Sequence, residues 1–177
     1  GTAGPDCHQL GSLVFDNADR AAAEQGWTSL LSEFGASDDL ADLADFTALA
    51  DQHLVGWQYW HYKEWGDPTT ESQESGGQGM FTDDADLSTL KQAKADILIR
   101  AYPRATAGTP LSWLPLGDAF LYWYRPARGV TEIVMPARHF PRGYTVKLEG
   151  PARVVSKPGA SVLKIRTTGS TGSVSVV

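Results

Sequence analysis

The pattern of apolar residues changes once along the chain, near Pro103, and this change limits the possible folds more than any other feature. Before Pro103, segments with helical spacing alternate with segments typical of strands. The expected helices cover residues 10–26, 37–54 and 83–102, and the expected strands cover residues 27–34 and 54–62. Such alternation predicts parallel strands joined by helical crossovers. Because two parallel strands alone leave both faces and both edges uncovered, we expect the missing strands to come from elsewhere in a longer gene product.

The part after Pro103 lacks helical spacing and contains short strand-like segments separated by turns with Pro or Gly. The candidate strands are 111–115, 118–125, 130–135, 143–149, 152–156, 161–167 and 172–177. Short strands at this regular spacing predict a small antiparallel β-sandwich. We therefore expect two domains, one over residues 1–104 and a sandwich over residues 105–177.

Charge is divided unevenly between the two parts. Residues 1–103 hold 18 acidic and 5 basic side chains, whereas residues 104–177 hold 3 acidic and 10 basic ones. An acidic first part argues against nucleic acid as its partner. The basic second part could face an anionic membrane surface, dock on the acidic part or lie in solvent.

The sequence gives no indication of a metal site or a disulfide. Cys7 is the single cysteine, which excludes an internal disulfide and a multi-thiolate metal site. His8, His53 and His139 have no ligand spacing among them. We therefore expect neither a bound metal nor a cofactor.

Glu33 ends the first expected strand, and aromatic residues crowd the end of the second. In a (β/α)8 barrel the carboxyl ends of the strands carry the active site, and a carboxylate there can attack the anomeric carbon of a sugar. Taken alone, the short segment Glu-Phe-Gly favours an ordinary strand-end carboxylate in an ion pair over a catalytic role for Glu33. The aromatic rings could be core, but next to a strand that ends in Glu they favour a carbohydrate site, since rings stack on sugar faces and His61 or Lys63 can bind hydroxyl groups.

Four segments carry a resemblance to a known family. Residues 31–39 (LSEFGASDD) resemble the strand-seven nucleophile segment of glycoside hydrolase family 5, and more narrowly that of endoglycoceramidases, with Ser32 in place of Thr. Residues 56–63 (GWQYWHYK) resemble strand eight of the same enzymes. Residues 100–110 resemble their passage from the last helix to the C-terminal sandwich, and residues 136–141 resemble a segment inside that sandwich.

This resemblance implies a fold, a reaction and a set of site residues. The fold is the C-terminal part of a (β/α)8 TIM barrel followed by an antiparallel β-sandwich. Glu33 is the expected nucleophile, Trp60 the tryptophan that floors the sugar site, and the expected substrate-binding residues also include His61, Tyr62 and Lys63. The expected reaction cleaves the β-glycosidic bond between the glycan and ceramide of a glycosphingolipid with retention of configuration. Related bacterial enzymes are secreted, so we expect secretion here.

Retention requires a second carboxyl group about 5–5.5 Å from the nucleophile. In the family this acid/base Glu follows an Asn at the end of strand four, and the sequence has no Asn-Glu pair. Together with the missing strands, this predicts a partner: an N-terminal fragment of the same enzyme that carries strands one to six and the acid/base.

Two alternatives to this function remain open. The chain could be a non-catalytic module that binds glycan or lipid, or it could belong to a family 5 enzyme acting on a simpler β-glucoside. An esterase lacks support because the sequence has no Gly-x-Ser-x-Gly elbow. The polar residues 66–82 form either a solvated loop or a rim of the substrate groove with Met80 and Phe81 as apolar contacts.

Overall fold

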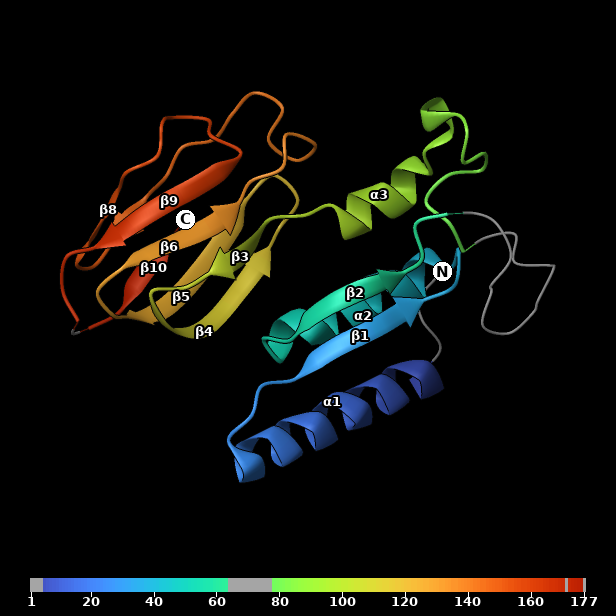
Figure 1. Ribbon diagram of the computed structural model, residues 1–177, viewed down its shortest axis with the longest axis horizontal. Coiled ribbons are helices and arrows are strands. Elements are labelled where there is room, and N and C mark those ends of the chain that lie inside the picture. Colours follow the sequence, from blue (N-terminus) through green and yellow to red (C-terminus); the bar gives the residue numbers. More distant parts are fainter. Residues whose placement is uncertain (1–4, 64–77, 171, 177) are drawn as a thin grey trace. The chain divides into compact units, whose positions relative to one another are not determined.

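The computed structural model describes residues 5–63, 78–170 and 172–176, and the chain forms two compact units, Gly1–Leu98 and Ile99–Val177. Figure 1 shows the helices and the parallel strand pair of the first unit and the strands of the second. This division lies before the boundary expected at residues 104/105. The cause is β3 (Tyr102–Ala105), which pairs with β6 (Val130–Val134) and so joins the second unit.

The first unit alternates helices and strands as predicted. Its elements are α1 (Pro5–Gln25), β1 (Leu30–Gly35), α2 (Leu40–Gln52), β2 (Gly56–Trp60), a 3₁₀ turn η1 (Leu87–Thr89) and α3 (Gln92–Leu98). Strands β1 and β2 are parallel, with a register that runs from Leu30↔Gly56 to Gly35↔Trp60. The predicted parallel pair is therefore confirmed, and in the part of the chain that the structure describes these two strands do not close into a barrel.

Helix α2 packs on one face of the two strands, and α1 packs against α2. Their shared core contains Phe15, Leu49, Ala50 and Val55, with Leu31, Phe46 and Trp57 packed against it. Large apolar side chains remain exposed elsewhere in the unit, on α1, on β1 and between the two; they include Leu10, Leu13, Trp27 and Leu30. None of the described helices is long and apolar enough to cross a membrane.

The predicted helix over residues 83–102 is wrong in its extent. Residues 83–91 instead contain η1 and a bridge between Phe81 and Leu90, and α3 ends at Leu98. Two aspartates explain the late start. Asp83 accepts a hydrogen bond from the Ala85 backbone N–H at 2.9 Å and Asp86 accepts one from Ser88 at 2.8 Å, and such local bonds compete with a regular helix.

The second unit contains two four-stranded antiparallel sheets, so the predicted antiparallel β part is confirmed. One sheet has the order β4-β5-β10-β7 and the other the order β3-β6-β9-β8. The strands not yet given are β4 (Gly108–Pro115), β5 (Phe120–Pro126), β7 (Leu148–Glu149), β8 (Ala152–Val154), β9 (Val162–Thr167) and β10 (Val174–Val176). Each predicted strand contains or overlaps one of these, and β3 is an addition.

Inward-facing side chains of both sheets form one core. On β5 the alternation is complete, because Phe120, Tyr122 and Tyr124 are buried while the intervening residues are more exposed. They meet Ile133 of β6 and further buried residues of the core, among them Leu163, Ile165, Val174 and Val176. The shared core of two sheets defines a β-sandwich.

Candidate functional site

Glu33 lies near the carboxyl end of β1. The next residue, Phe34, packs on the helix side, where its ring stacks on Phe46 of α2 at 6.3 Å. Leu31, three positions before Phe34, also packs against the helices, so an extra residue interrupts the alternation, and Ser32 and Glu33 together lie opposite Gln58 of β2; Glu33 is exposed. The pairing of β1 with β2 is irregular between Leu31 and Phe34, the stretch that contains Glu33.

Trp60 is the last residue of β2 and lies beside the carboxyl end of β1. It pairs with Gly35, and its carbonyl oxygen accepts a hydrogen bond from the Ala36 N–H at 2.7 Å. Its neighbour Tyr59 packs on Phe34 on the helix side, with ring centroids 6.0 Å apart. Trp57 also packs against the helices, so alternation along β2 directs Trp60 to the face away from them. The structure thus brings a carboxylate and an indole to adjacent carboxyl ends of two parallel strands.

The three residues after Trp60 do not extend the strand. A cis peptide bond joins Trp60 to His61, and their rings meet edge to face at 5.2 Å. Tyr62 is 61% exposed and its ring contacts Phe81 at 5.3 Å, while Lys63 is exposed. Thus the His61 ring lies beside the Trp60 ring, whereas the Tyr62 ring contacts Phe81, in the segment that precedes α3.

Met80 and Phe81, which we expected at the rim of a substrate groove, lie in the interior of the first unit. Residues 64–77 lie outside the described residues. Met80 and Phe81 are buried with Ala95 of α3, so the interpretation of these two as contacts for substrate is wrong. Their apolar side chains are used to attach α3 to the strands, because Tyr59 packs against the same cluster.

Sequence analysis missed Lys94, a buried lysine on α3. Its side chain is 1% exposed. The ammonium group donates to the Tyr59 hydroxyl at 2.9 Å and to the Gly79 carbonyl at 3.1 Å, and it forms an ion pair with Asp38. One signal was available: Lys94 follows Leu90 by four residues and precedes Leu98 by four, so it occupies the apolar face of the segment.

Asp38 follows β1 and forms ion pairs with two lysines. Lys91 approaches one of its carboxylate oxygens at 3.0 Å, and Lys94 binds the other. Partial burial acts to raise the pKa of Asp38, but the hydrogen bonds and charges of the two lysines outweigh it and leave this pKa below its ordinary value. The carboxylate is therefore held in its ionised form.

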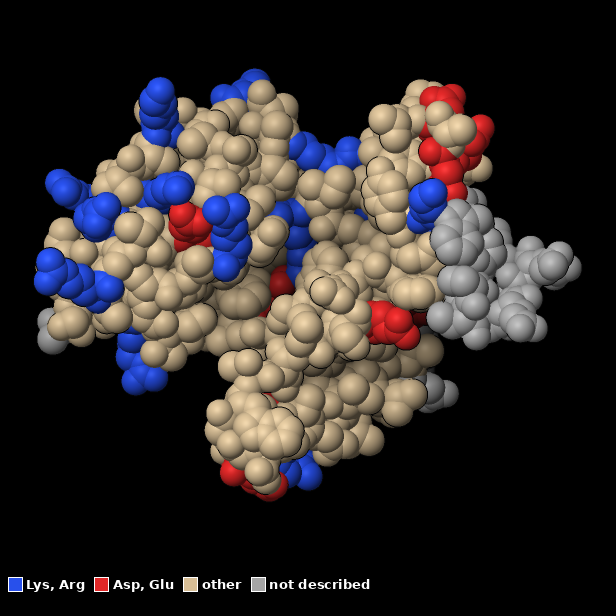
Figure 2. All heavy atoms as spheres, in the orientation of Figure 1, with Lys and Arg blue, Asp and Glu red and all other residues tan. Residues whose placement is uncertain are grey.

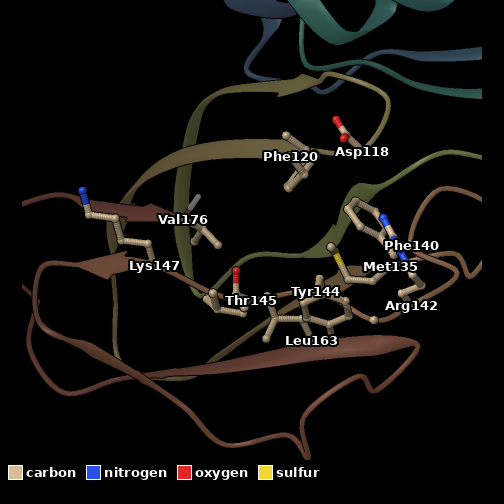
Figure 3. Close-up of a pocket in the computed structure, with 13 residues that line it drawn as sticks. Asp118, Phe120, Met135, Phe140, Arg142, Tyr144, Thr145, Lys147, Leu163 and Val176 are labelled. Carbon is tan, nitrogen blue, oxygen red and sulfur yellow. The ribbon is translucent and has the colours of Figure 1, made fainter.

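The second unit has a depression of about 580 Å³, formed by residues 118–176 only. Figure 3 shows Phe120 on one side of it and Tyr144 and Leu163 on the other, while Lys147 points away. None of the residues expected to bind substrate lines it. Among the described residues no group of His, Cys, Asp and Glu could hold a metal ion.

A parallel strand pair with a carboxylate and a tryptophan at adjacent strand ends, followed by an antiparallel sandwich, defines a class: an α/β portion with an appended β-domain. Residues 100–177 match the glycoside hydrolase family 5 C-terminal domain. This stretch therefore belongs to that domain family, and the resemblance of the chain to endoglycoceramidase-like members of glycoside hydrolase family 5 is confirmed.

Relatives cover both units. The chain is 32% identical over 168 residues to endoglycoceramidase I of Rhodococcus hoagii, an alignment that covers 93% of this chain and 30% of the relative. Endo-glycoceramidase II from Rhodococcus sp., in complex with a five-membered iminocyclitol, is 26% identical with a TM-score of 0.68, over 92% of this chain and 36% of that one. The chain thus spans about a third of the length of these relatives.

A more distant structure has the same fold. Sterylglucosidase 1 of Cryptococcus neoformans is 14% identical, with a TM-score of 0.69 over 96% of this chain and 32% of that one. At this identity the likeness concerns the fold alone.

Proposed function

We propose that this chain supplies the nucleophile of a retaining glycosidase that cleaves the bond between glycan and ceramide in glycosphingolipids. The observation that carries the proposal is the position of Glu33 and Trp60 at the adjacent carboxyl ends of two parallel strands. The relatives support the substrate class and the stereochemistry: endo-glycoceramidase II has been solved as a lactosyl-enzyme intermediate and with ganglioside GM3. A covalent glycosyl-enzyme is the mark of a retaining mechanism.

In this proposal Glu33 attacks the anomeric carbon while a second carboxyl group protonates the departing ceramide oxygen. Water, deprotonated by the same second group, then releases the glycan from Glu33 with retained configuration. Trp60 stacks on an apolar face of the sugar, and His61 beside it is placed to bind a hydroxyl group. Tyr62 and Lys63 follow farther along the chain from the strand end, and we propose that they contact the substrate at the periphery of the site.

The acid/base and the remaining barrel strands would come from an N-terminal polypeptide of the same enzyme, whether joined to this chain or separate. Both edges of the β1–β2 pair need partners, since unpaired strand edges expose backbone N–H and C=O groups. Leu30 is 60% exposed on β1 and Trp27 is 66% exposed just before it. These side chains offer apolar surface that such a polypeptide would cover.

Replacement of Glu33 tests the proposal. In the assembled enzyme, Glu33→Gln removes the nucleophile at nearly constant shape, and we expect hydrolysis of a glycosphingolipid to fall by at least about 10³-fold. Glu24→Gln, at an exposed position on α1, is the matched control and should retain activity. Full activity of Glu33→Gln would contradict the proposal. Hydrolysis of a simple β-glucoside with no hydrolysis of glycosphingolipid would instead support the simpler-substrate alternative.

We also propose that the sandwich contacts anionic membrane, where such substrates reside, and that the enzyme is secreted. Residues 99–177 contain eleven Lys and Arg against three Asp and Glu. Figure 2 shows Lys and Arg side chains spread over the visible face of this unit. Arg153 of β8 and Arg166 of β9 are directly opposite each other and exposed. Like charges in this arrangement repel, and in the described part of the chain neither arginine is ion-paired.

A vesicle experiment tests the membrane contact. The double variant Arg153→Gln/Arg166→Gln should lose most of its binding to vesicles that contain phosphatidylserine, and wild-type binding should weaken as salt is raised. The control Arg104→Gln/Lys147→Gln removes the same charge from residues that pair with Glu132 and Glu149. Equal loss in the two double variants would show a dependence on net charge only, and equal binding to neutral vesicles would contradict the proposal.

A further inference from the structure

Lys94 is buried and charged, an expensive combination that requires compensation. An ammonium group removed from water loses several kcal/mol of hydration, which hydrogen bonds and an opposite charge must offset. Here Lys94 has the Tyr59 hydroxyl, the Gln78 and Gly79 carbonyl oxygens and the Asp38 carboxylate around it. The Tyr59 hydroxyl in turn donates to the Gln78 carbonyl oxygen. Such a satisfied polar cluster fixes the relative positions of the segments that it joins.

Those segments are the two that carry the proposed site. Asp38 belongs to the loop directly after β1, the strand of Glu33, and Tyr59 belongs to β2 directly before Trp60. Lys94 of α3 therefore connects the carboxyl ends of both strands to one helix. We name Asp38, Tyr59 and Lys94 the strand-end clamp.

Tyr59 also supports the backbone that follows Glu33. A Cβ atom built on Gly35 would lie 2.3 Å from the Tyr59 ring, so only a glycine lets the ring lie flat against the strand at this point. The same ring meets Phe34 edge to face. Tyr59 thus contacts the two residues that follow Glu33, directly after the stretch where the β1–β2 pairing loses its regular register.

We propose that Lys94 is a positioning residue: through Tyr59 and Asp38 it fixes Glu33 relative to Trp60. Where the strand ladder is irregular, backbone pairing gives less support, and the strand-end clamp supplies the missing constraint from behind the sheet. A nucleophile must be held close to its productive geometry, because a displacement of about 1 Å can cost on the order of 10²-fold in rate. This inference rests on the proposed role of Glu33.

The test measures covalent labelling rather than stability. In the assembled enzyme, a 2-fluoro glycoside that leaves a stable glycosyl group on the nucleophile is followed by intact mass, and an iminocyclitol competitor reports sugar binding. We expect Lys94→Met to lower the labelling rate constant by about 10- to 100-fold while competitor affinity changes by less than about threefold. Lys91→Met, which removes a second lysine from Asp38 and keeps the hydrogen bond between Lys94 and Tyr59, should label at close to the wild-type rate.

A conservative variant keeps the test decisive if Lys94→Met does not fold. Tyr59→Phe preserves the ring under Gly35 and removes only the hydroxyl that Lys94 binds. We expect it to slow labelling in the same direction, and the two changes together should be less than additive because they break one connection. Wild-type labelling rates in folded Lys94→Met or in Tyr59→Phe would overturn the inference. Glu33→Gln that still labels would overturn the proposed nucleophile itself, whatever the clamp variants do.

Discussion

Packing in the sandwich core changes the pKa of two tyrosines on β5. Tyr122 and Tyr124 are fully buried and stack on each other with ring centroids 5.1 Å apart. Burial raises the pKa of Tyr122 to about 12, although its hydrogen bond with Thr106 acts in the opposite direction and Tyr124 adds to the rise. Burial raises the pKa of Tyr124 as well. Both hydroxyl groups therefore stay neutral in the folded protein well into the alkaline range.

This shift predicts alkaline instability. The unfolded chain releases the Tyr122 proton near pH 10 while the folded chain keeps it to about pH 12, so the unfolded state binds fewer protons in this interval. The free energy of unfolding should be unaffected by this group below pH 10 and fall by up to about 1.4 kcal/mol per pH unit above it. Chemical denaturation between pH 8 and 12 measures the effect. Tyr122→Phe should show a weaker pH dependence, and an unchanged dependence would contradict the assignment.

At the scale of the element, the start of α2 is set by its own side chains. Asp39 is the N-cap, and one of its carboxylate oxygens accepts hydrogen bonds from the Ala41 and Asp42 N–H groups at 2.9 and 3.3 Å. The hydroxyl oxygen of Ser37 accepts from the Asp39 N–H at 2.9 Å. The helix start predicted at residues 37–39 is thereby confirmed. The same short connection carries Asp38, so the cap lies next to the strand-end clamp in the chain.

Loss of this cap should weaken the first unit. Asp39→Ala leaves two helix N–H groups without their acceptor, and we expect the free energy of unfolding to fall by about 1 kcal/mol. Asp39→Asn keeps an acceptor oxygen at the same position and should remain close to wild type. Urea denaturation of the three proteins is the measurement. An equal loss in both variants would show that the charge, and not the cap, is what stabilises the helix.

At the scale of the whole molecule, the two units have separate cores. The sandwich core draws on residues after Arg100, whereas the two apolar clusters of the first unit draw on residues before Ile99. The sandwich strands pair with one another, whereas the strands described in the first unit form one parallel pair. The two units therefore have different requirements for folding.

We expect residues 99–177 to fold alone, with cooperative thermal unfolding and β-sheet circular dichroism. Residues 1–98 alone should bind a hydrophobic dye, because Leu10, Trp27 and Leu30 remain exposed, and should lose that binding when the N-terminal polypeptide is added. Native mass spectrometry of the purified enzyme should detect the 19.1 kDa chain together with that polypeptide, covalently joined or associated. An active 19.1 kDa species without a companion would contradict the two-part enzyme.

Sequence patterns predicted the elements well where the signal is local. The strand of Glu33, the aromatic strand and the sandwich strands all have clear periodicity or Gly and Pro at their ends. Strand β3 was missed because Tyr102 and Pro103 follow a helical pattern, and their partner strand begins only at Val130. Lys94 was missed because its partner Tyr59 is 35 residues away, and a lysine is ordinarily a surface residue. The role of Glu33 stays a prediction.

The position of β10 has a consequence for synthesis of the protein. Val174–Val176 is the last strand of its unit in chain order, yet it lies inside its sheet, between β5 and β7. Translation delivers this strand after the other strands of its unit, so the sheet has a gap until the ribosome has released residues 174–176. A polypeptide that stops shortly before Val174 would therefore lack an interior strand and would leave the backbone of β5 uncovered.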